Sequence, residues 1–536
     1  MNLNRNRAAV LAAVVAILAA SGCRGAKVRP ITPGEIEAHI RFLSDDLLEG
    51  RLTGSRGLSL AGLYHESCFR SLGLEPVFDG RYRQAFDLKG ALPDPAAGLD
   101  IFNTDGILSP RRLDDCVVAS FREDCPEGVE GELVYAGYLI QAPERNWDDV
   151  KGADLKGKVL LIEINEPGNE PGGIFDGLDM TYYGRWICKF EKASELGAAG
   201  CLIIHNTKGA AYGWDVVRNS WSGEQFFLPD REQKLFFRGW ISGETAEQVF
   251  RLAGRERGLL LARAEKSDFV PVPLDLKARV RQRPSFRIVP TENVAALLRG
   301  KRGGRKERTI VISAHYDHLG MDDSLQGDRI YNGAVDNSSA SATMLALARY
   351  FSERAGDLKA DLLFAAVTAE EQNLLGSDYF VRHLPVPAAS VLADLNLEMT
   401  NVWGETEDVF GIGAKHSDLD EALARAARNL GLTYTTERFG ELGFFFRSDQ
   451  LSFARGGIPA VWLHHGVVSR GKDKERVALA YDEYRRAGYH KVTDEIKPNW
   501  DLRGAVQIAL WAEEIIDILA EAETPPEYKP TSSFKR

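Results

Sequence analysis

The sequence predicts an α/β fold in which helices cover both faces of one large sheet. Four runs of strand length are apolar on both faces: residues 309–314, 361–368, 391–399 and 458–464. Such strands are typical of a sheet buried between two helical layers. Stretches with helical periodicity separate these runs. We therefore expect a three-layer sandwich with a mixed, mostly parallel sheet over residues 272–525.

Two of the intervening helices have clear apolar stripes. The first stripe consists of Met344, Leu347, Ala348 and Phe351, and the second of Ile508, Trp511, Ala512, Ile515 and Leu519. This spacing is that of an α-helix with one buried face. Both helices are expected to pack against the sheet.

The residues before the sandwich divide into two parts. Residues 30–130 are expected to form the N-terminal part of the same domain, because 35–74 has a helical pattern around a Gly-rich stretch. Residues 131–271 alternate short β-rich runs with turns and one helix, which predicts a small inserted α/β domain. The insert has no cluster of metal ligands. Residues 526–536 are expected to be a C-terminal tail.

Residues 1–23 are typical of an export signal. Two arginines precede an apolar run from Ala8 to Ala20, which is too short to span a bilayer. Ala20-Ser-Gly-Cys23 is similar to the lipobox of bacterial lipoproteins, in which the cysteine receives lipid. An ordinary secretory leader is the alternative. Both interpretations predict a periplasmic, extracellular or membrane-anchored protein that contacts the membrane only through Cys23.

Composition excludes several classes of function. Charged residues make up 27% of the chain, and the net charge of −11 is spread along it. Without a basic patch, nucleic acid is not an expected partner. Five further cysteines, Cys68, Cys116, Cys125, Cys188 and Cys201, lack C-x-x-C spacing. They predict neither a disulfide framework nor a thiolate metal site, although a Cys116–Cys125 pair stays open.

An imidazole and a carboxylate follow the first strand of the sandwich. The run 309–314 leads into His315-Tyr-Asp317-His318, where His315 and Asp317 point the same way because strand side chains alternate. A carboxylate in that place holds an imidazole in its metal-binding tautomer. Alone, such a pair is equally compatible with a surface hydrogen bond. His318 is expected to have a supporting or structural role.

Three carboxylates follow at the next boundaries. Asp336 lies before the helix of Met344, where helix capping is the simple alternative. Glu370 and Glu371 follow the run 361–368, and one of them can bind metal while the other handles a proton. Two solvated glutamates are the alternative interpretation.

The last polar positions are in residues 391–399 and near residue 490. Asp394, Asn396 and Glu398 are expected on one strand face by the period of two, and buried polar groups require partners. His490 lies outside any periodic pattern, so alone it indicates an ordinary loop histidine. Two imidazoles and several carboxylates at strand ends and helix starts nevertheless suit two hydrolytic zinc ions.

Taken together, these residues resemble the co-catalytic zinc aminopeptidase and glutamate carboxypeptidase family. The family's site residues follow the order His-x-Asp, Asp, Glu-Glu, Asp, His, and the resemblance covers residues 272–525. In the insert, residues 146–149, 152–162 and 197–200 look like the protease-associated domain of many family members. The resemblance implies a zinc-peptidase sandwich with that domain inserted.

The resemblance also assigns roles. It implies two Zn²⁺ per chain, the first held by His315, Asp336 and Glu398 and the second by Asp336, Glu371 and His490. Asp317 orients His315. Glu370 corresponds to the general base, which takes a proton from the attacking water and delivers it to the leaving amine. Tyr489 corresponds to a tyrosine that faces the developing oxyanion.

One position departs from the family pattern. Aminopeptidases of this family usually have aspartate where this chain has Glu398, in Asn396-Leu-Glu398-Met399. The longer side chain must still reach the metal. Asp394 is the alternative ligand from the same strand.

The function implied by the resemblance is removal of N-terminal residues from peptides, with the insert narrowing access to the site. A carboxypeptidase or dipeptidase of the same fold is the strongest alternative. Phe444–Phe446 and Arg447 either line its pocket or pack in the core. A glutaminyl-cyclase-like acyltransferase with one zinc and a noncatalytic protein like the transferrin receptor are the remaining alternatives; the retained ligand set counts against both.

Overall fold

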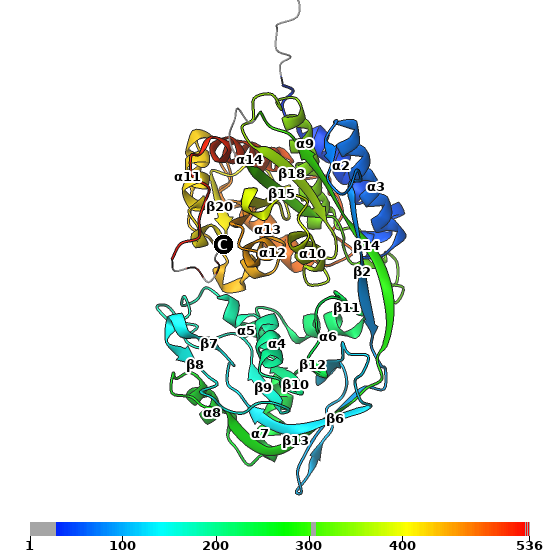
Figure 1. The fold of residues 1–536 in the computed structure, drawn as a ribbon, viewed down its shortest axis with the longest axis vertical. Helices are drawn as coiled ribbons and strands as arrows, with labels where there is room; N and C mark the ends of the chain where they lie inside the picture. The colour runs from blue at the N-terminus through cyan, green and yellow to red at the C-terminus, as the bar shows by residue number, and fades with distance from the viewer. Residues whose placement is uncertain (1–27, 302–306, 531, 533, 535–536) are drawn as a thin grey trace, which may run out of the picture.

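The computed structural model describes residues 28–301, 307–530, 532 and 534. The predicted signal peptide and Cys23 lie outside these residues, so export and lipid anchoring stay predictions. Two α/β bodies make up the molecule (Figure 1). We call residues 28–92 and 285–534 the larger body, and residues 93–284 the smaller body. No helix within the described ranges is long and apolar enough to cross a membrane.

The larger body is built on a ten-stranded mixed sheet. Its strands, in spatial order, are β11 (Gln225–Phe227), β2 (Arg83–Leu92), β14 (Ser285–Leu298), β18 (Asp361–Val367), β15 (Thr309–His315), β19 (Val391–Asn396), β22 (Ala460–His465), β20 (Asp408–Ile412) and β21 (Thr433–Tyr434), with β1 (Glu75–Pro76) beside β14. Parallel pairing joins the four central strands, β18, β15, β19 and β22, and also β20 with β21, so the sheet is mixed and is mostly parallel only at its centre. Antiparallel pairs flank the central strands on both sides.

Helices cover both faces of this sheet, as the sequence predicts. One face packs against α2 (Pro33–Leu43), α3 (Arg56–Ser71), α9 (Ala340–Ser352), α11 (Leu419–Asn429) and α14 (Arg503–Glu521). The other face packs against α10 (Leu375–Arg382) and α12 (Gln450–Arg455). Within β14, Val294 and Ala296 point to the first face and Ala295 and Leu297 to the second. The predicted stripes of α9 and α14 are buried.

The smaller body has its own eight-stranded sheet. The order is β4 (Ile107–Leu108), β3 (Gly98–Phe102), β13 (Val272–Arg281), β6 (Gly128–Tyr135), β9 (Val159–Glu163), β10 (Gly200–Ile204), β12 (Phe237–Ile241) and β5 (Cys116–Ala119). It carries α4 (Trp186–Glu195), α6 (Trp214–Ser222), α7 (Gly243–Leu252) and α8 (Arg257–Ala264), with apolar clusters on both faces. All five described cysteines are free.

This sheet extends beyond the predicted insert of residues 131–271. Strands β3, β4 and β5 precede residue 131, and β13 continues to Arg281. β3 pairs with β13, which lies about 170 residues later, and β5 pairs with β12. Pairings over such separations leave no mark on the local pattern, which is why the sequence placed 98–119 in the larger body.

A long antiparallel pair connects the two bodies. β2 and β14 run from the larger sheet toward the smaller body, where Leu92 lies opposite Ser285 (Figure 1). The chain leaves at the end of β2 and returns at the start of β14. From within the smaller body, β11 pairs with β2. This arrangement holds the smaller body next to the carboxyl ends of the central strands, where the predicted site residues lie.

Candidate metal centre

The carboxyl ends of three neighbouring parallel strands bring the predicted residues together. His315 is the last residue of β15, Glu370 and Glu371 follow β18, and Glu398 follows β19. Because β18, β15 and β19 are adjacent and parallel, their ends meet at one edge of the sheet. The site therefore lies where binding sites of open α/β sheets usually lie.

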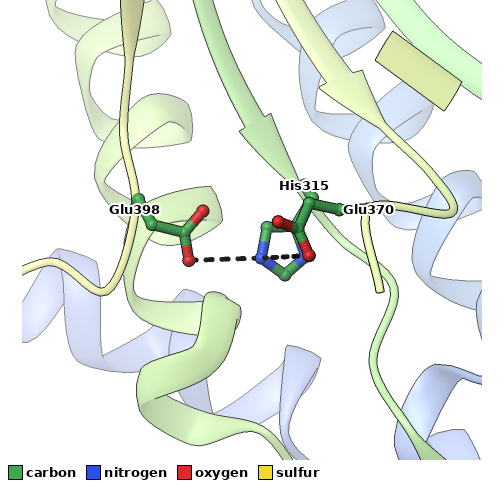
Figure 2. A group of neighbouring side chains, drawn as sticks. All are labelled: His315, Glu370 and Glu398. Carbon is green, nitrogen blue, oxygen red and sulfur yellow. Dashed lines mark hydrogen bonds and ion pairs between the residues drawn. The ribbon is translucent and has the colours of Figure 1, made fainter. Parts of the chain in front are cut away.

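His315 is the centre of the first group of ligands. Its Nε2 atom lies 3.2 Å from Asp336 Oδ1 and 3.3 Å from Glu398 Oε1. Glu370 Oε2 is farther away, at 4.0 Å. Figure 2 shows the Glu398 carboxylate beside the imidazole and the Glu370 carboxylate overlapping the ring in this view, with dashed lines from the imidazole to both.

His490 is the centre of the second group. Its Nε2 atom lies 3.1 Å from Glu371 Oε2 and 3.4 Å from Asp336 Oδ2. The two oxygens of Asp336 therefore face different imidazoles. This is the arrangement expected of a carboxylate that bridges two metal ions.

These distances fit zinc better than direct hydrogen bonds. Two ligand atoms that each lie about 2.1 Å from a tetrahedral zinc are about 3.4 Å apart. The four contacts of His315 and His490 with their carboxylates span 3.1 to 3.4 Å. A charge-assisted N–H···O bond is shorter, about 2.7 to 2.9 Å. Imidazole and carboxylate donors without thiolate are also those of hydrolytic zinc sites.

The carboxylates of the centre are buried together, and this shifts their pKa values in opposite directions. Burial raises the pKa of Glu370 well above its usual range; His315 opposes this shift, and Glu371 adds to it. For Glu371, burial alone would raise the pKa. Attraction to His490 and hydrogen bonds with His318 and His490 outweigh burial and lower the pKa to about 2. Buried carboxylates so close together require cations, because uncompensated charge is costly in the interior.

Asp317 lies behind the first imidazole. His315 Nδ1 is 3.6 Å from Asp317 Oδ1 and 3.2 Å from its backbone oxygen. A proton held on this side leaves Nε2 free to bind metal. The Asp317 carboxylate also accepts the backbone N–H groups of Glu370 and Glu371, at 3.1 and 3.3 Å. It therefore orients the glutamate pair as well as the imidazole.

Left-handed backbone conformations occur beside three site residues. Ala369 has φ 52°, Met399 has φ 41°, and His490 itself has φ 56°. Residues other than glycine seldom adopt such angles, and they persist where the surrounding structure holds them. At Ala369 the backbone turns just after β18. The side chain of Glu370 then points toward His315, and that of Glu371 toward His490.

Glu398, and not Asp394, reaches His315. Asp394 lies within β19 and accepts a hydrogen bond from Ser313 Oγ at 2.8 Å. β19 ends at Asn396, so the strand expected to run over 391–399 is three residues shorter and does not include Glu398. The chain has left the strand by Glu398, whose Oε2 accepts a hydrogen bond from Ser448 Oγ at 2.8 Å.

Tyr489 lies at the rim of the centre. Its ring stacks on the His490 ring, with 3.9 Å between centroids and 22° between planes. The side chain is 38% exposed. Tyr489 thus faces the cavity in front of the predicted metals.

Two residues contribute more than the sequence indicates. His318, expected to be supporting, places Nδ1 2.7 Å from Glu371 Oε1. Asp494 accepts the backbone N–H groups of Val335 and Asp336 at 2.9 and 3.0 Å. In the sequence, His318 is notable only because it comes three residues after His315, and Asp494 because it comes four residues after His490. Neither separation reveals a contact with another segment.

A cavity of about 970 Å³ opens in front of the centre, between the two bodies. From the larger body it is lined by Glu370, His490 and Arg447, and from the smaller body by Arg185, Tyr212 and Trp221, among others. The walls of the cavity thus come from both bodies. Phe444 and Phe446 also line the cavity, whereas Phe445 packs in the core.

The part of the chain that carries these residues is similar to a known family. Residues 293–513 match Peptidase family M28. A probable leucine aminopeptidase of Arthroderma benhamiae is 28% identical over 200 residues, which cover 36% of this chain and 53% of the relative. Aminopeptidase YwaD of Bacillus subtilis is 24% identical over 414 residues, covering 73% of this chain and 75% of the relative. The chain thus spans about half the length of the fungal relative.

The fold also resembles a solved structure. An aminopeptidase from Aneurinibacillus sp. strain AM-1 aligns over 94% of this chain and 98% of its own, with TM-score 0.54 and 21% identity. At this identity the likeness concerns the fold alone. It extends over both bodies.

Proposed function

We propose that this chain, whose residues 293–513 match peptidase family M28, is an exported zinc-dependent aminopeptidase that removes N-terminal residues from peptides. This match supports the predicted family and a peptidase activity. One observation carries the metal-dependent activity: the Asp336 carboxylate offers one oxygen to each of two imidazole-centred groups. The names of the relatives support cleavage at the N-terminus.

The ligand assignment follows from the contacts. We assign His315, Asp336 and Glu398 to one zinc, and Asp336, Glu371 and His490 to the other. Zinc bound there would polarise the peptide carbonyl and lower the pKa of water.

Glu370 is the proposed general base. It lines the cavity, and its carboxylate is too far from His315 Nε2 for a hydrogen bond. Burial raises its pKa, which strengthens it as a proton acceptor. It takes a proton from the attacking water and passes it to the leaving amine. The Tyr489 hydroxyl donates a hydrogen bond to the carbonyl oxygen as negative charge develops there.

A carboxypeptidase is the second candidate. The observation that favours it is the position of Arg447, which lines the cavity and can bind a C-terminal carboxylate. Cleavage of an N-blocked peptide distinguishes the two polarities.

The decisive experiment combines metal content with turnover. Zinc in the purified protein is measured by mass spectrometry, together with hydrolysis of an aminoacyl amide with a free N-terminus and of an N-blocked peptide. The parent is compared with Glu370→Gln, and with Glu421→Gln as a control because Glu421 is exposed on α11. We expect two zinc ions and cleavage of the free amine only. Glu370→Gln should retain zinc and lose about 10²- to 10⁴-fold in kcat.

Other outcomes lead to different functions. Activity on the blocked peptide alone reverses the polarity. One bound metal without peptidase turnover favours the cyclase-like acyltransferase, and no bound metal favours a noncatalytic binding protein. Unchanged kcat in Glu370→Gln removes Glu370 from the mechanism.

A further inference from the structure

Two arginines from different bodies face the cavity in front of the metal centre. Arg185 immediately precedes α4 of the smaller body, and Arg447 follows the 444–446 turn of the larger body. Both line the cavity together with Glu370 and His490. Tyr212 also lines it, and the Arg447 guanidinium lies 5.5 Å from the centre of the Tyr212 ring.

Both guanidinium groups have unused donors. Arg185 is only 8% exposed, and its buried Nε has no hydrogen-bond partner among the described residues. The buried Nε of Arg447 likewise has none there, and its Nη2 donates to the Ala210 carbonyl at 3.3 Å. A guanidinium carries five N–H donors, and leaving them unpaired in the interior is costly.

The two charges also act against each other. Burial, followed by repulsion from Arg447, lowers the pKa of Arg185 to about 9, so the side chain stays charged at neutral pH. Three other arginines that line the cavity have acidic partners: Arg231 pairs with Asp378, Arg455 with Glu191 and Arg485 with Asp482. Arg238 also lines the cavity without an ion pair among the described residues, but its guanidinium is stacked over the Phe121 ring at 3.6 Å. Within the described chain, neither Arg185 nor Arg447 forms such an ion pair. A bound anion would compensate both.

The shape and position of the pair narrow the choice of anion. A planar guanidinium fork matches a carboxylate through two parallel hydrogen bonds. Arg447 is followed by Ser448, whose Oγ donates to the proposed ligand Glu398 at 2.8 Å. The Arg447 backbone is therefore next to the residue that contacts Glu398, and an anion bound by Arg447 would share the cavity with Glu370 and His490. A volume of about 970 Å³ is within the range of pockets for small ligands.

We propose that Arg185 and Arg447 form a carboxylate-binding subsite that selects short peptides with a negative charge next to the bond that is cleaved. The proposal rests on the proposed peptidase function. The carboxylate has two possible sources: the free C-terminus of a dipeptide, or the side chain of an N-terminal acidic residue.

Two matched pairs of ligands distinguish these sources. Leu-Ala and Leu-Ala amide differ in the C-terminal charge, whereas Glu-Ala amide and Gln-Ala amide differ in the side-chain charge. Dissociation constants are measured by calorimetry in zinc-loaded Glu370→Gln, which does not depend on turnover, and KM is measured in the parent. We expect the charged member of one pair to bind about 10- to 100-fold more tightly, the effect of one or two charge-assisted hydrogen bonds.

Substitution of the arginines tests the assignment. Arg447→Gln and Arg185→Gln, each combined with Glu370→Gln, should bring the charged and neutral ligands to within threefold of each other. Arg447→Lys should retain part of the preference, because the charge remains but the fork is lost. Arg231→Gln is the matched control, since Arg231 lines the same cavity but is already paired. Arg447 is only half-buried, so it carries the test if Arg185→Gln does not fold.

Each outcome decides a separate question. A preference in the first pair assigns the C-terminal carboxylate, and one in the second pair assigns the acidic side chain. No preference in either pair, or a preference that survives both arginine substitutions, overturns the proposal. Charge-dependent binding without turnover by the parent contradicts the peptidase function and leaves the subsite intact.

Discussion

At the scale of single residues, two aspartates position the proposed metal ligands through the backbone. Asp317 accepts the N–H groups of Glu370 and Glu371, and Asp494 accepts those of Val335 and Asp336. Each carboxylate thus fixes the peptide of a residue whose side chain is a proposed ligand. Such supporting groups commonly affect metal affinity nearly as much as the ligands do.

Asp494→Asn should therefore weaken zinc binding without unfolding the protein. An amide has one acceptor oxygen, so its NH₂ group would face the Asp336 N–H that Asp494 now accepts. We expect zinc affinity to fall about 10- to 100-fold, measured by competition with a chelator. Asp482→Asn, at an exposed position of α13 (Arg476–Ala487), is the control. Equal affinities in the two variants would contradict a positioning role for Asp494.

Glu398→Asp tests the position that departs from the family pattern. Glu398 Oε1 lies 3.3 Å from His315 Nε2, and Oε2 accepts from Ser448. Removing one methylene withdraws the carboxylate from both partners. We predict that one zinc becomes about tenfold weaker while the other stays bound, measured as stoichiometry in a zinc titration. Two unchanged affinities would mean that the chain adapts to the shorter side chain.

Sequence reasoning located the candidate ligands but not their supports. His315, Asp336 and Glu371 stand at element boundaries, where a polar group after an apolar run is visible in sequence. Asp494 and Ser448 act on segments about 160 and 50 residues away. Such contacts depend on how loops fold back, which single-sequence periodicity does not encode.

At the scale of elements, Arg51 holds together the segments that carry the site. It is fully buried and donates to the carbonyls of Tyr316, Asn332 and Gly333 at 2.9, 2.6 and 3.1 Å, and also to Leu43. Tyr316 follows β15, and the 332–333 turn leads to Asp336. A Gly-rich stretch that the sequence placed in a purely helical layer thus reaches under the metal centre.

Arg51→Met should destabilise the larger body. Four buried carbonyls lose a donor, and each unpaired group costs about 1–3 kcal/mol where water cannot replace it. We expect the free energy of unfolding in urea to fall by at least about 3 kcal/mol. Arg56→Met, at an exposed position, is the control. A loss equal to that of the control would show that water satisfies the carbonyls.

The larger sheet was more predictable than the smaller one, for a physical reason. β15 and β18 are apolar on both faces and end within one residue of the predicted runs. β3 and β5 are short, and their partners β13 and β12 come more than 100 residues later. A short strand is recognisable only through its partner. The predicted insert therefore began at residue 131, whereas the strands of the smaller body begin at β3.

At the scale of the whole molecule, the smaller body should restrict which peptides reach the centre. It contributes Arg185, Tyr212 and Trp221 to the cavity wall. Because Leu92 lies opposite Ser285, residues 93–284 can be replaced by an Asn-Gly hairpin between β2 and β14. We predict that this deletion raises kcat/KM for a ten-residue peptide relative to a dipeptide at least tenfold. Unchanged activity on both lengths would exclude a role in access.

Buried neutral histidines should make the whole molecule sensitive to acid. Burial lowers the pKa values of His65 and His465 to about 4 each, and burial together with Lys415 does the same for His416. In the unfolded chain these side chains bind protons near pH 6.5, whereas in the folded chain they do so only near pH 4. Their stabilising contribution is therefore complete above pH 6.5 and is lost as the pH falls toward 4.

His65 allows this linkage to be measured at one site. It lies on the buried face of α3, where its ring contacts Tyr316 and Nδ1 donates to the Ala61 carbonyl. A shift of about 2.5 pH units corresponds to about 3 kcal/mol between pH 7.5 and 4. His65→Leu removes this proton uptake, so its free energy of unfolding should fall less than that of the parent over the same range. Because both proteins keep the same proposed metal ligands, loss of zinc at low pH cancels in the difference. Parallel curves would show that His65 has the same pKa in the folded and the unfolded chain, which would contradict the prediction.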